Sequence, residues 1–356
     1  MNKVSDPLFI DADISVASTL EGRFYSDEAM FARLRERVFA RTWQWIGELA
    51  DVAEPQSLAP RTLLPGFMDE PLLLARDAAG KLRCLSNVCT HRGNILVTQA
   101  CRAKEIRCGY HSRRFELDGR MTFMPEFKEA REFPLAADNL PAVALGEWAG
   151  FGFASIDPAA PFDHFLADMR AATAALPLGE MRLDSARSRD YAVQAHWALY
   201  VENYLEGFHI PFVHKGLNEV VDDGSYETRL HRYSNVQFAQ TRAGEPAAQY
   251  WWIFPNLMLN FYPWGLSLNC VEPLAIDRTR VAFRAFVWDR AKLGEGAGAS
   301  LDRVEAEDEA IVEAVQRGVR SRLYRRGRYS PTRERGVHHF HRLLCELLQG
   351  GGEPLQ

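Results

Sequence analysis

Long apolar runs, an excess of basic residues and closely spaced cysteines are all missing from this sequence of 356 residues. A membrane-spanning helix needs about 20 apolar residues, and no run approaches that length, so no membrane partner is expected. The net charge of −5 provides no basic field for nucleic acid or anionic lipid. Residues 1–7 show neither the basic segment nor the apolar core of a signal peptide. We therefore expect a cytoplasmic protein.

Cysteine is scarce, with six residues in the chain. Six cysteines spread over this length do not form a disulfide scaffold, and cytosolic thiols stay reduced or bind metal. The expected small buried side chains are Cys84, Cys101, Cys270 and Cys345. A G-x-G-x-x-G motif after a predicted strand is also missing, so the chain is not expected to accept hydride by itself.

The length suggests about two domains, and the residue pattern changes along the chain. A helix is expected to begin at Ser26, within an N-terminal segment of residues 1–45. Residues 46–155 contain short apolar runs separated by Pro, Gly and Asp, which predicts a small β domain. Residues 156–350 mix helical and strand patterns. Together these features indicate the α+β class.

Individual elements can be placed within both domains. Residues 72–85 are expected to form a hairpin with a turn at 77–80, and residues 118–119 repeat an Asp-Gly turn signature. Residues 148–156 have the composition of one buried strand. The second domain is expected to contain helices at 195–215 and 302–325 and strands at 226–239, 248–261, 265–272 and 279–289.

The two remaining cysteines are each closely followed by a histidine. Cys89 and His91 form the first pair and Cys108 and His111 the second, in the pattern C-x-H-x16-C-x2-H. Each pair presents two ligands from one turn, and the intervening residues let both loops close on one centre. Zinc could accept these four side chains, and so could a two-iron, two-sulfur cluster of the Rieske type. The one-residue gap favours the cluster, because such close ligands reach adjacent irons more easily than one tetrahedral ion.

A second group of potential ligands lies in the second domain. Asn203, Glu206 and His209 recur every three residues, so a continuous helix would place them on one face. His214 follows five residues later, roughly 140° around an undisturbed helix. Pro211 is expected to distort this helix and to bring His214 back beside His209. Histidines on an apolar helix are often core residues, but two of them near a carboxylate also fit a metal site.

Two histidines and one carboxylate bind mononuclear iron and leave positions open for O2 and substrate. The candidate carboxylates lie in the acidic run at 305–309, which could equally be a solvated helix start. Apolar residues recur in helical phase around this run, namely Val304, Ile311, Val315, Val319 and Leu323. Asp308 falls on that stripe, whereas the three glutamates of the run point away from it. A buried acid is costly unless paired or metal-bound, so Asp308 is the expected third ligand.

These motifs together resemble the α subunits of Rieske non-haem iron oxygenases, also called aromatic-ring-hydroxylating oxygenases. The resemblance covers nearly the whole chain and rests on C-x-H-R-G with C-x-Y-H, on E-N-Y-x-E-x-x-H-x4-H, and on E-D-x4-E-x-x-Q. It implies a [2Fe-2S] cluster bound by Cys89, His91, Cys108 and His111. It also implies a mononuclear Fe(II) bound by His209, His214 and Asp308.

The resemblance further implies a fold and a quaternary structure. A Rieske β domain would be joined to a helix-grip catalytic domain, whose antiparallel sheet grips long helices and on which the N-terminal segment packs. Glu206 matches the acid that links an iron-bound histidine to a cluster histidine of a neighbouring subunit, and Asn203 matches a residue near the iron. A homotrimer is expected, because the cluster and iron of one chain lie too far apart for efficient electron transfer. Electrons would come from NAD(P)H through a separate reductase or ferredoxin.

Two positions depart from the commonest pattern of the family. Arg113 stands where many members have Trp, and we expect it to make the rim of the cluster more positive. The acid at Glu206 is Asp in the best-known naphthalene-type dioxygenases. With Tyr204 before it, Glu206 is more similar to the choline-, carnitine- and betaine-type monooxygenase branch.

The implied reaction uses O2 and reductase-supplied electrons to oxidise a small organic substrate. Residues 250–258 and 261–264 concentrate aromatic side chains, which either enclose a trimethylammonium group by cation–π attraction or form strand core. The expected activity is hydroxylation or N-demethylation of a quaternary ammonium compound, and the alternative is aromatic-ring mono- or dihydroxylation. A Rieske electron carrier and a zinc-bound regulator are the non-enzymatic alternatives. A carrier needs no second metal site, so His209, His214 and Asp308 argue against it.

Overall fold

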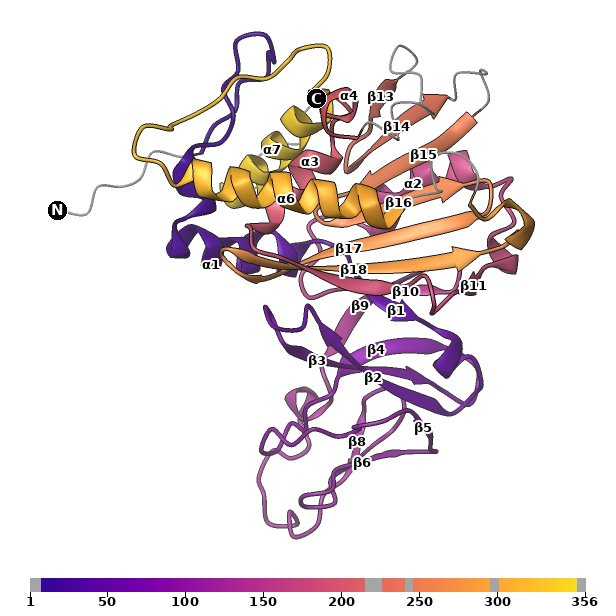
Figure 1. Cartoon of the computed structure of the whole chain (residues 1–356). Coiled ribbons are helices and arrows are strands. Elements are labelled where there is room, and N and C mark those ends of the chain that lie inside the picture. The colour runs from indigo at the N-terminus through magenta and orange to yellow at the C-terminus, as the bar shows by residue number, and fades with distance from the viewer. Residues whose placement is uncertain (1–7, 215–225, 241–245, 295–300, 351–356) are drawn as a thin grey trace, which may run out of the picture. The chain divides into compact units, whose positions relative to one another are not determined.

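The computed structural model describes residues 8–214, 226–240, 246–294 and 301–350 of the chain. The chain forms two compact units, drawn in Figure 1. One unit comprises residues 43–159, and the other comprises 1–42 together with 160–356. Helices and antiparallel sheets occur together, so the predicted α+β class is confirmed. None of the described helices is long and apolar enough to cross a membrane.

Residues 43–159 form a β unit with two antiparallel sheets. The larger sheet has the order β1-β10-β9-β4-β3-β2-β5, and the smaller has the order β6-β7-β8. The larger sheet contains β1 (Gln44–Glu48), β2 (Ser57–Leu63), β3 (Glu70–Arg76), β4 (Leu82–Ser86), β5 (Cys101–Arg102), β9 (Ala142–Trp148) and β10 (Phe151–Ser155). The smaller contains β6 (Ile106–Arg107), β7 (Arg114–Phe115) and β8 (Met121–Phe123). Short 3-10 helices in this unit are η3 (Ala50–Val52) and η4 (Ala136–Asp138).

Glycines with a positive φ lie in two tight turns of the β unit. β3 and β4 form the predicted hairpin, and Gly80 takes the positive φ of 85° that the turn requires. The single strand predicted at 148–156 is wrong, because a turn divides it into β9 and β10. Ala149 and Gly150 both have positive φ, as a tight two-residue hairpin turn demands, and they bring Phe151 opposite Trp148.

The larger unit is built on an eight-stranded antiparallel sheet. Its order is β11-β18-β17-β16-β15-β14-β13, and β12 also pairs with β18. The strands are β11 (Arg182–Leu183), β12 (Arg189–Val193), β13 (Glu227–Leu230), β14 (Ser234–Gln240), β15 (Pro246–Ile253), β16 (Leu257–Tyr262), β17 (Gly265–Ala275) and β18 (Arg278–Val287). The strand predicted at 226–239 is therefore two strands, β13 and β14.

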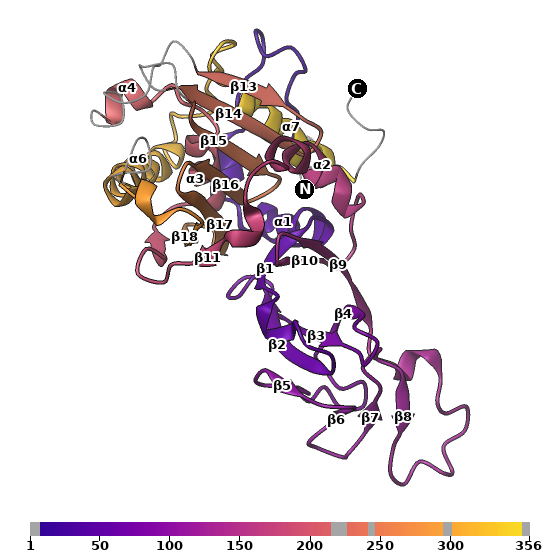
Figure 2. The same ribbon diagram turned by 90° about the vertical axis from the view of Figure 1, so that its right-hand side faces the viewer.

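Helices cover this sheet. They are α1 (Glu28–Arg37), α2 (Phe162–Thr173), α3 (Trp197–Tyr204), α4 (Ile210–Val213), α6 (Leu301–Val319) and α7 (Arg335–Leu348). The 3-10 helices are η1 (Gly22–Tyr25), η2 (Phe39–Arg41), η5 (Leu178–Glu180) and η7 (Arg290–Lys292). α3 contacts both α6 and β17, and Figure 2 shows the same arrangement from a second direction. The helix predicted at 302–325 corresponds to α6, but α7 was not predicted.

The N-terminal segment belongs to the larger unit. Its helix is capped by Asp27 rather than by Ser26, because the Asp27 carboxylate accepts hydrogen bonds from the N–H groups of Ala29 and Met30. The guanidinium of Arg33 then donates to the carbonyl oxygen of Leu348, 2.8 Å away at the end of α7. The segment is therefore joined to the last helix of the chain.

α7 passes very close to the end of α3. A Cβ atom at Gly336 would lie 2.5 Å from the carbonyl oxygen of Leu205, which is nearer than any real Cβ contact allows. Glycine is therefore required here by close approach of backbone to backbone. The contact ties the start of α7 to the residue that directly follows α3.

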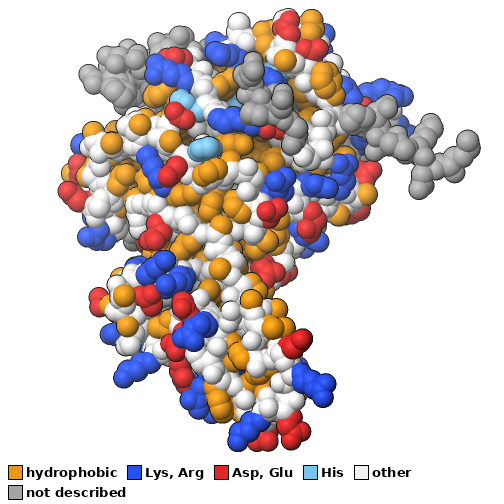
Figure 3. Space-filling view, turned by 180° about the vertical axis from the view of Figure 1, so that it is seen from behind, with side chains coloured by type: hydrophobic (Ala, Val, Ile, Leu, Met, Phe, Trp, Pro, Cys, Tyr) orange, Lys and Arg blue, Asp and Glu red, His pale blue; other side chains and the backbone are white. Residues whose placement is uncertain are grey.

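Surface features agree with some of the sequence-based expectations and not with others. Figure 3 shows Lys and Arg interspersed with Asp and Glu over the face it displays, without a large field of one sign. Cys84, Cys270 and Cys345 are buried as predicted, but Cys101 is exposed. Cys101 lies in the two-residue edge strand β5, where both residues face solvent.

Candidate metal centres and substrate cavity

The segment that carries the predicted histidine ligands is not one helix. α3 ends at Tyr204, and α4 begins one residue before Pro211. The prediction that Asn203, Glu206 and His209 share one helical face is therefore wrong. Pro211 starts a new helix rather than distorting an old one, because a missing N–H costs no hydrogen bond in the first helical turn.

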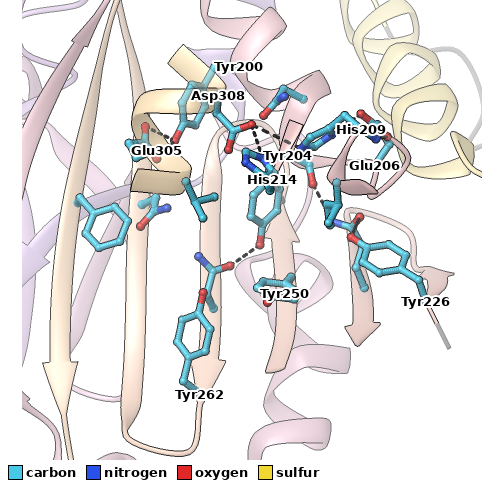
Figure 4. Close-up of a pocket in the computed structure, with 17 residues that line it drawn as sticks. Tyr200, Tyr204, Glu206, His209, His214, Tyr226, Tyr250, Tyr262, Glu305 and Asp308 are labelled. Atoms are coloured by element: carbon cyan, nitrogen blue, oxygen red, sulfur yellow. Dashed lines mark hydrogen bonds and ion pairs between the residues drawn. The ribbon is translucent and has the colours of Figure 1, made fainter. Parts of the chain in front are cut away.

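This break brings His209 and His214 to one carboxylate, as Figure 4 shows. Nε2 of His214 lies 3.0 Å from Oδ1 of Asp308, and Nε2 of His209 lies 3.4 Å from the same oxygen. The two rings are nearly perpendicular, with centroids 5.1 Å apart. One ligand atom from each of the three residues lies within 4.8 Å of the others. The donor set and its spacing fit a mononuclear iron with open positions.

Each of these histidines has a further carboxylate at its other ring nitrogen. Nδ1 of His209 lies 2.6 Å from Oε1 of Glu206, and Nδ1 of His214 lies 2.8 Å from Oε2 of Glu307. A carboxylate at Nδ1 holds a proton there, which leaves the Nε2 lone pair free for a metal. Glu206 is itself fixed by hydrogen bonds from the N–H groups of Phe208 and His209. The contact of Glu307 was missed, because helical phase had directed that residue away from the site.

Asp308 faces the histidines as predicted, but the physical reason given for choosing it was wrong. Ile311 and Val315 are 41% and 42% exposed, so the predicted apolar stripe is not the buried face of α6. Leu323 lies beyond the end of this helix. Among the described side chains of α6, the buried ones are Glu305, Val312, Gln316 and Val319. Asp308 lies at the border of that face, where it is only partly exposed.

A cavity of about 120 Å³ lies beside these three residues. Its walls include Asn203 and five tyrosines, namely Tyr200, Tyr204, Tyr226, Tyr250 and Tyr262. Strand register explains how polar side chains from separate strands meet there, since Gln237 is opposite Tyr250 and Tyr250 is opposite Asn260. Directly opposed residues point to the same face of a sheet. In Figure 4, Tyr250 and Tyr262 lie on the other side of His214 from Asp308.

Hydrogen bonds hold the tyrosine rings in place. The Tyr204 hydroxyl donates to Oδ1 of Asn260 at 2.6 Å, and the Tyr226 hydroxyl donates to Oε1 of Gln237 at 2.6 Å. The amide of Gln237 donates in turn to the carbonyl oxygen of Tyr204 at 2.9 Å. Burial raises the pKa of Tyr204 well above its usual value, so its ring is a neutral phenol. The polar residues of β14 and β16 were the signal in the sequence that a cavity faces these strands.

A buried acid forms part of the cavity wall. Glu305 is 6% exposed, and both of its carboxylate oxygens lie 2.7 Å from the Tyr200 hydroxyl. Burial, and then the negative charge of Glu305, raise the pKa of Tyr200 well above its usual value. The sequence had placed Glu305 away from the buried face, and the structure places it on that face.

The predicted aromatic cluster is divided between the cavity and the core. Tyr250 and Tyr262 line the cavity. The neighbouring aromatic side chains are fully or almost fully buried in the core, and these are Trp251, Trp252, Phe254, Phe261 and Trp264. The cluster therefore contributes both to the cavity wall and to the strand core.

The other predicted metal group lies in the β unit. Cys89 and Cys108 are each 2% exposed, and the rings of His91 and His111 have centroids 4.8 Å apart. The N–H of Tyr110 points to Sγ of Cys108 at 3.4 Å, as donors to a thiolate ligand do. Nδ1 of His111 is buried and has no hydrogen-bond partner among the described residues. Coordination to metal would satisfy that atom, so the four side chains fit a Rieske cluster.

Arg113 is not at the rim of this group, contrary to expectation. Its side chain is 2% exposed, and its guanidinium lies 2.6 Å from Oδ1 of Asp138. A hydrogen bond from the N–H of Leu135, and then the Arg113 guanidinium, hold the pKa of Asp138 below its usual value. The positive charge is therefore matched by an adjacent carboxylate instead of being added to the surface.

Two family models match the chain. The Rieske [2Fe-2S] domain matches residues 42–134, and the catalytic domain of the ring hydroxylating alpha subunit matches residues 227–350. The chain belongs to the Rieske non-haem iron oxygenases. It is therefore an O2-dependent oxidoreductase with a Rieske cluster and a mononuclear iron as cofactors. The predicted enzyme class is confirmed, and the electron-carrier and zinc-regulator alternatives no longer apply.

Relatives of this Rieske oxygenase include choline and carnitine monooxygenases. It is 29% identical to the chloroplastic choline monooxygenase of Arabidopsis thaliana, over 94% of this chain and 83% of that protein. It is 28% identical to the carnitine monooxygenase oxygenase subunit of Escherichia coli (strain K12), over 94% of each. The solved quaternary ammonium Rieske monooxygenase CntA matches with a TM-score of 0.77 at 25% identity, over 95% of this chain and 97% of that one. Naphthalene 1,2-dioxygenase shares the fold, with a TM-score of 0.71 at 17% identity over 93% and 92%.

Proposed function

We propose that this oxygenase hydroxylates or N-demethylates a small quaternary ammonium compound. The observation that carries the proposal is the cavity beside His209, His214 and Asp308, which combines five tyrosines with the buried carboxylate of Glu305. Aromatic faces attract a cation by about 0.5–2 kcal/mol per contact. A buried carboxylate adds direct charge complementarity. None of the described lining residues is Lys or Arg, so these walls offer no counter-charge to an anionic group.

The relatives support the same substrate class. Choline and carnitine both carry a trimethylammonium group, and enzymes named for oxidising them match 94% of this chain. In the structural matches, CntA occurs in complexes with L-carnitine and with gamma-butyrobetaine. The naphthalene dioxygenase match is too distant to favour an aromatic substrate over these.

We assign the ligands on the geometry described above. Cys89, His91, Cys108 and His111 bind the cluster, and His209, His214 and Asp308 bind the iron. When bound, the cluster supplies electrons one at a time and the iron supplies O2 activation. The acids around the iron ligands keep protons at Nδ1, and the tyrosine walls exclude water and orient the substrate.

Glu206 and Asn203 have supporting roles in this proposal. Glu206 orients His209 and lies on the route by which an electron arrives from the cluster of a neighbouring subunit. Asn203 lines the cavity beside the iron ligands. The assembly is a homotrimer, and a separate NAD(P)H-dependent reductase or ferredoxin supplies the electrons.

A paired substrate panel tests the proposed function. Purified holoenzyme with a surrogate reductase is given choline, glycine betaine and carnitine, each against an analogue in which carbon replaces the ammonium nitrogen. We expect product formation coupled to NADH and O2 use with at least one cation and with none of the neutral analogues. Coupled oxidation of simple arenes, with only uncoupled O2 use in the presence of every cation, would establish the aromatic-ring alternative instead.

A further inference from the structure

One arginine is buried to an unusual degree in the β unit. Arg113 is 2% exposed. The other fully buried side chains of comparable size, throughout the described residues, are those of Trp and Phe. Arginine is rarely buried unless it is paired. Its position, two residues after His111, places this buried charge directly beside a cluster-binding loop.

The guanidinium of Arg113 has two hydrogen-bond acceptors. One N–H group donates to Oγ1 of Thr90 at 2.7 Å, and another donates to Oδ1 of Asp138 at 2.6 Å. The Thr90 hydroxyl donates in turn to the carbonyl oxygen of Asp138 at 2.7 Å. Thr90, Arg113 and Asp138 thus form a closed triangle of three hydrogen bonds, and the ring of Phe133 packs against the guanidinium at 5.4 Å.

The three corners of the triangle come from different segments. Thr90 lies between the first two ligands, Cys89 and His91, and Asp138 belongs to η4. Arg113 follows the second ligand pair, and its own carbonyl oxygen accepts from the N–H of Cys108 at 2.8 Å. The backbone of Arg113 therefore closes the second loop, while its side chain holds the first.

A further hydrogen bond between the two loops is weak. The Asn94 amide reaches Sγ of Cys108 at 3.7 Å, a long contact to a poor acceptor. Charge-assisted hydrogen bonds from a guanidinium, such as those of Arg113 to Thr90 and Asp138, are considerably stronger.

We propose that Arg113 is a positioning residue that clamps the two cluster-binding loops together through Thr90 and Asp138. The clamp acts by geometry, because a planar guanidinium presents donors in two fixed directions at once. Its charge is neutralised locally by Asp138, so a general electrostatic effect on the cluster is not its main role. This inference does not depend on the identity of the substrate.

Five variants of the full-length holoenzyme separate geometry from charge. Arg113→Met removes the clamp and the charge, and Arg113→Lys keeps the charge but loses the two-directional donor. Thr90→Val removes the hydroxyl that accepts from Arg113 and donates to Asp138, with almost no change of shape, and Thr90→Ser keeps that hydroxyl. The matched control is Arg114→Met, one residue away, which loses the same charge from a side chain that is 40% exposed.

The readouts are the rate at which the visible cluster absorption bleaches in a chelator, and the electron paramagnetic resonance spectrum of the reduced cluster. We expect bleaching about tenfold faster in both Arg113 variants and about threefold faster in Thr90→Val, because buried charge-assisted bonds are lost. Resonance lines should broaden as the histidines take up a range of orientations. Thr90→Ser and Arg114→Met should match the parent protein in both measurements.

Either of two results would overturn the clamp. Parent-like behaviour of Arg113→Lys would show that charge, not geometry, is what the cluster needs. Parent-like bleaching and line shape in Thr90→Val would show that the loops are held without the triangle. This second variant keeps the test decisive even if Arg113→Met fails to fold.

Discussion

Oε2 of Glu307 lies 2.8 Å from Nδ1 of His214, while Nε2 of the same ring faces Asp308 at 3.0 Å. The imidazole of His214 therefore lies between two carboxylates. Asp308 faces Nε2, the nitrogen proposed to bind iron, and Glu307 faces Nδ1, the other ring nitrogen. The Glu206–His209 pair repeats this arrangement. Two predictions about iron affinity and electron delivery come from these pairs, and a third comes from Asp308.

Glu307→Met should lower the affinity for the mononuclear iron by about 10- to 100-fold, because His214 loses the acceptor that fixes its proton at Nδ1. Iron content after dialysis against a series of chelator concentrations measures this change. Glu313→Met is the matched control on α6, since the Glu313 carboxylate accepts a hydrogen bond from the Gln194 N–H, which is part of neither metal group. Equal iron retention in both variants would contradict the role given to Glu307.

Asp308→Ala should lose the mononuclear iron and keep the visible spectrum of the cluster. The Asp308 carboxylate faces Nε2 of both histidines and is the proposed oxygen ligand of the iron. The proposed cluster ligands lie in the other unit. Metal analysis should find about two irons per chain instead of about three. Loss of the cluster as well would indicate that Asp308 is needed for folding.

Glu206→Gln should keep both metals but slow coupled turnover by about 100-fold, a large effect for a residue beside an iron ligand. The neutral amide can still accept from Nδ1 of His209, so the iron stays bound while the charged link toward the next subunit is lost. Steady-state rates are compared with a single turnover of enzyme that has been chemically reduced in advance. Near-normal steady-state turnover would place the electron route elsewhere.

Glu305→Gln should weaken the binding of quaternary ammonium substrates by about tenfold, because the cavity loses its buried negative charge. The amide preserves the size of the side chain and an acceptor for the Tyr200 hydroxyl. Binding is measured by titration calorimetry with a cation and with its neutral carbon analogue. An equal loss for both ligands would show that Glu305 shapes the cavity without recognising charge.

Acid should destabilise the larger unit through one fully buried and one partly buried histidine. Burial lowers the pKa of His196 to about 3 and that of His339 to about 4. In the unfolded chain both histidines have the usual pKa of about 6.5. As the pH falls, they therefore bind protons in the unfolded chain that they do not bind in the folded one. The free energy of unfolding should therefore decrease from about pH 6.5 downward, by up to about 1.4 kcal/mol per pH unit for each histidine.

Denaturant unfolding at a series of pH values from 7.5 to about 4.5 checks this dependence. In His196→Gln the slope should become shallower by about 1.4 kcal/mol per pH unit, because glutamine takes up no proton. His164→Gln, at an exposed position of α2, should leave the slope unchanged. An identical slope in the parent and in His196→Gln would refute the assignment.

The sequence predicted the chemistry of the sites better than their geometry. Ligand spacing predicted that Cys89, His91, Cys108 and His111 lie together, because such short spacings are set by one turn of chain. Asp308 was selected by assuming that apolar residues mark the buried face of α6, yet Glu305 and Gln316 are buried there instead. Helical phase fails where a cavity requires polar residues to face inward.

Contacts distant in sequence were beyond prediction. The pairing of Tyr200 with Glu305 joins residues 105 positions apart. Arg113 was expected at the rim of the cluster because it replaces an aromatic residue, and its acceptor, Asp138, lies 25 positions away in a different segment. Local composition contains no information about such partners.

The absence of a side chain at Gly336 also has a practical consequence. The start of α7 touches the carbonyl oxygen of Leu205, the last residue before the loop that leads to Glu206 and His209. α7 therefore supports the start of the loop that carries Glu206 and His209, although none of the three proposed iron ligands belongs to it. Shortened or C-terminally fused forms of the protein should be judged first by their iron content, since a disturbed last helix would resemble damage to the metal centre itself.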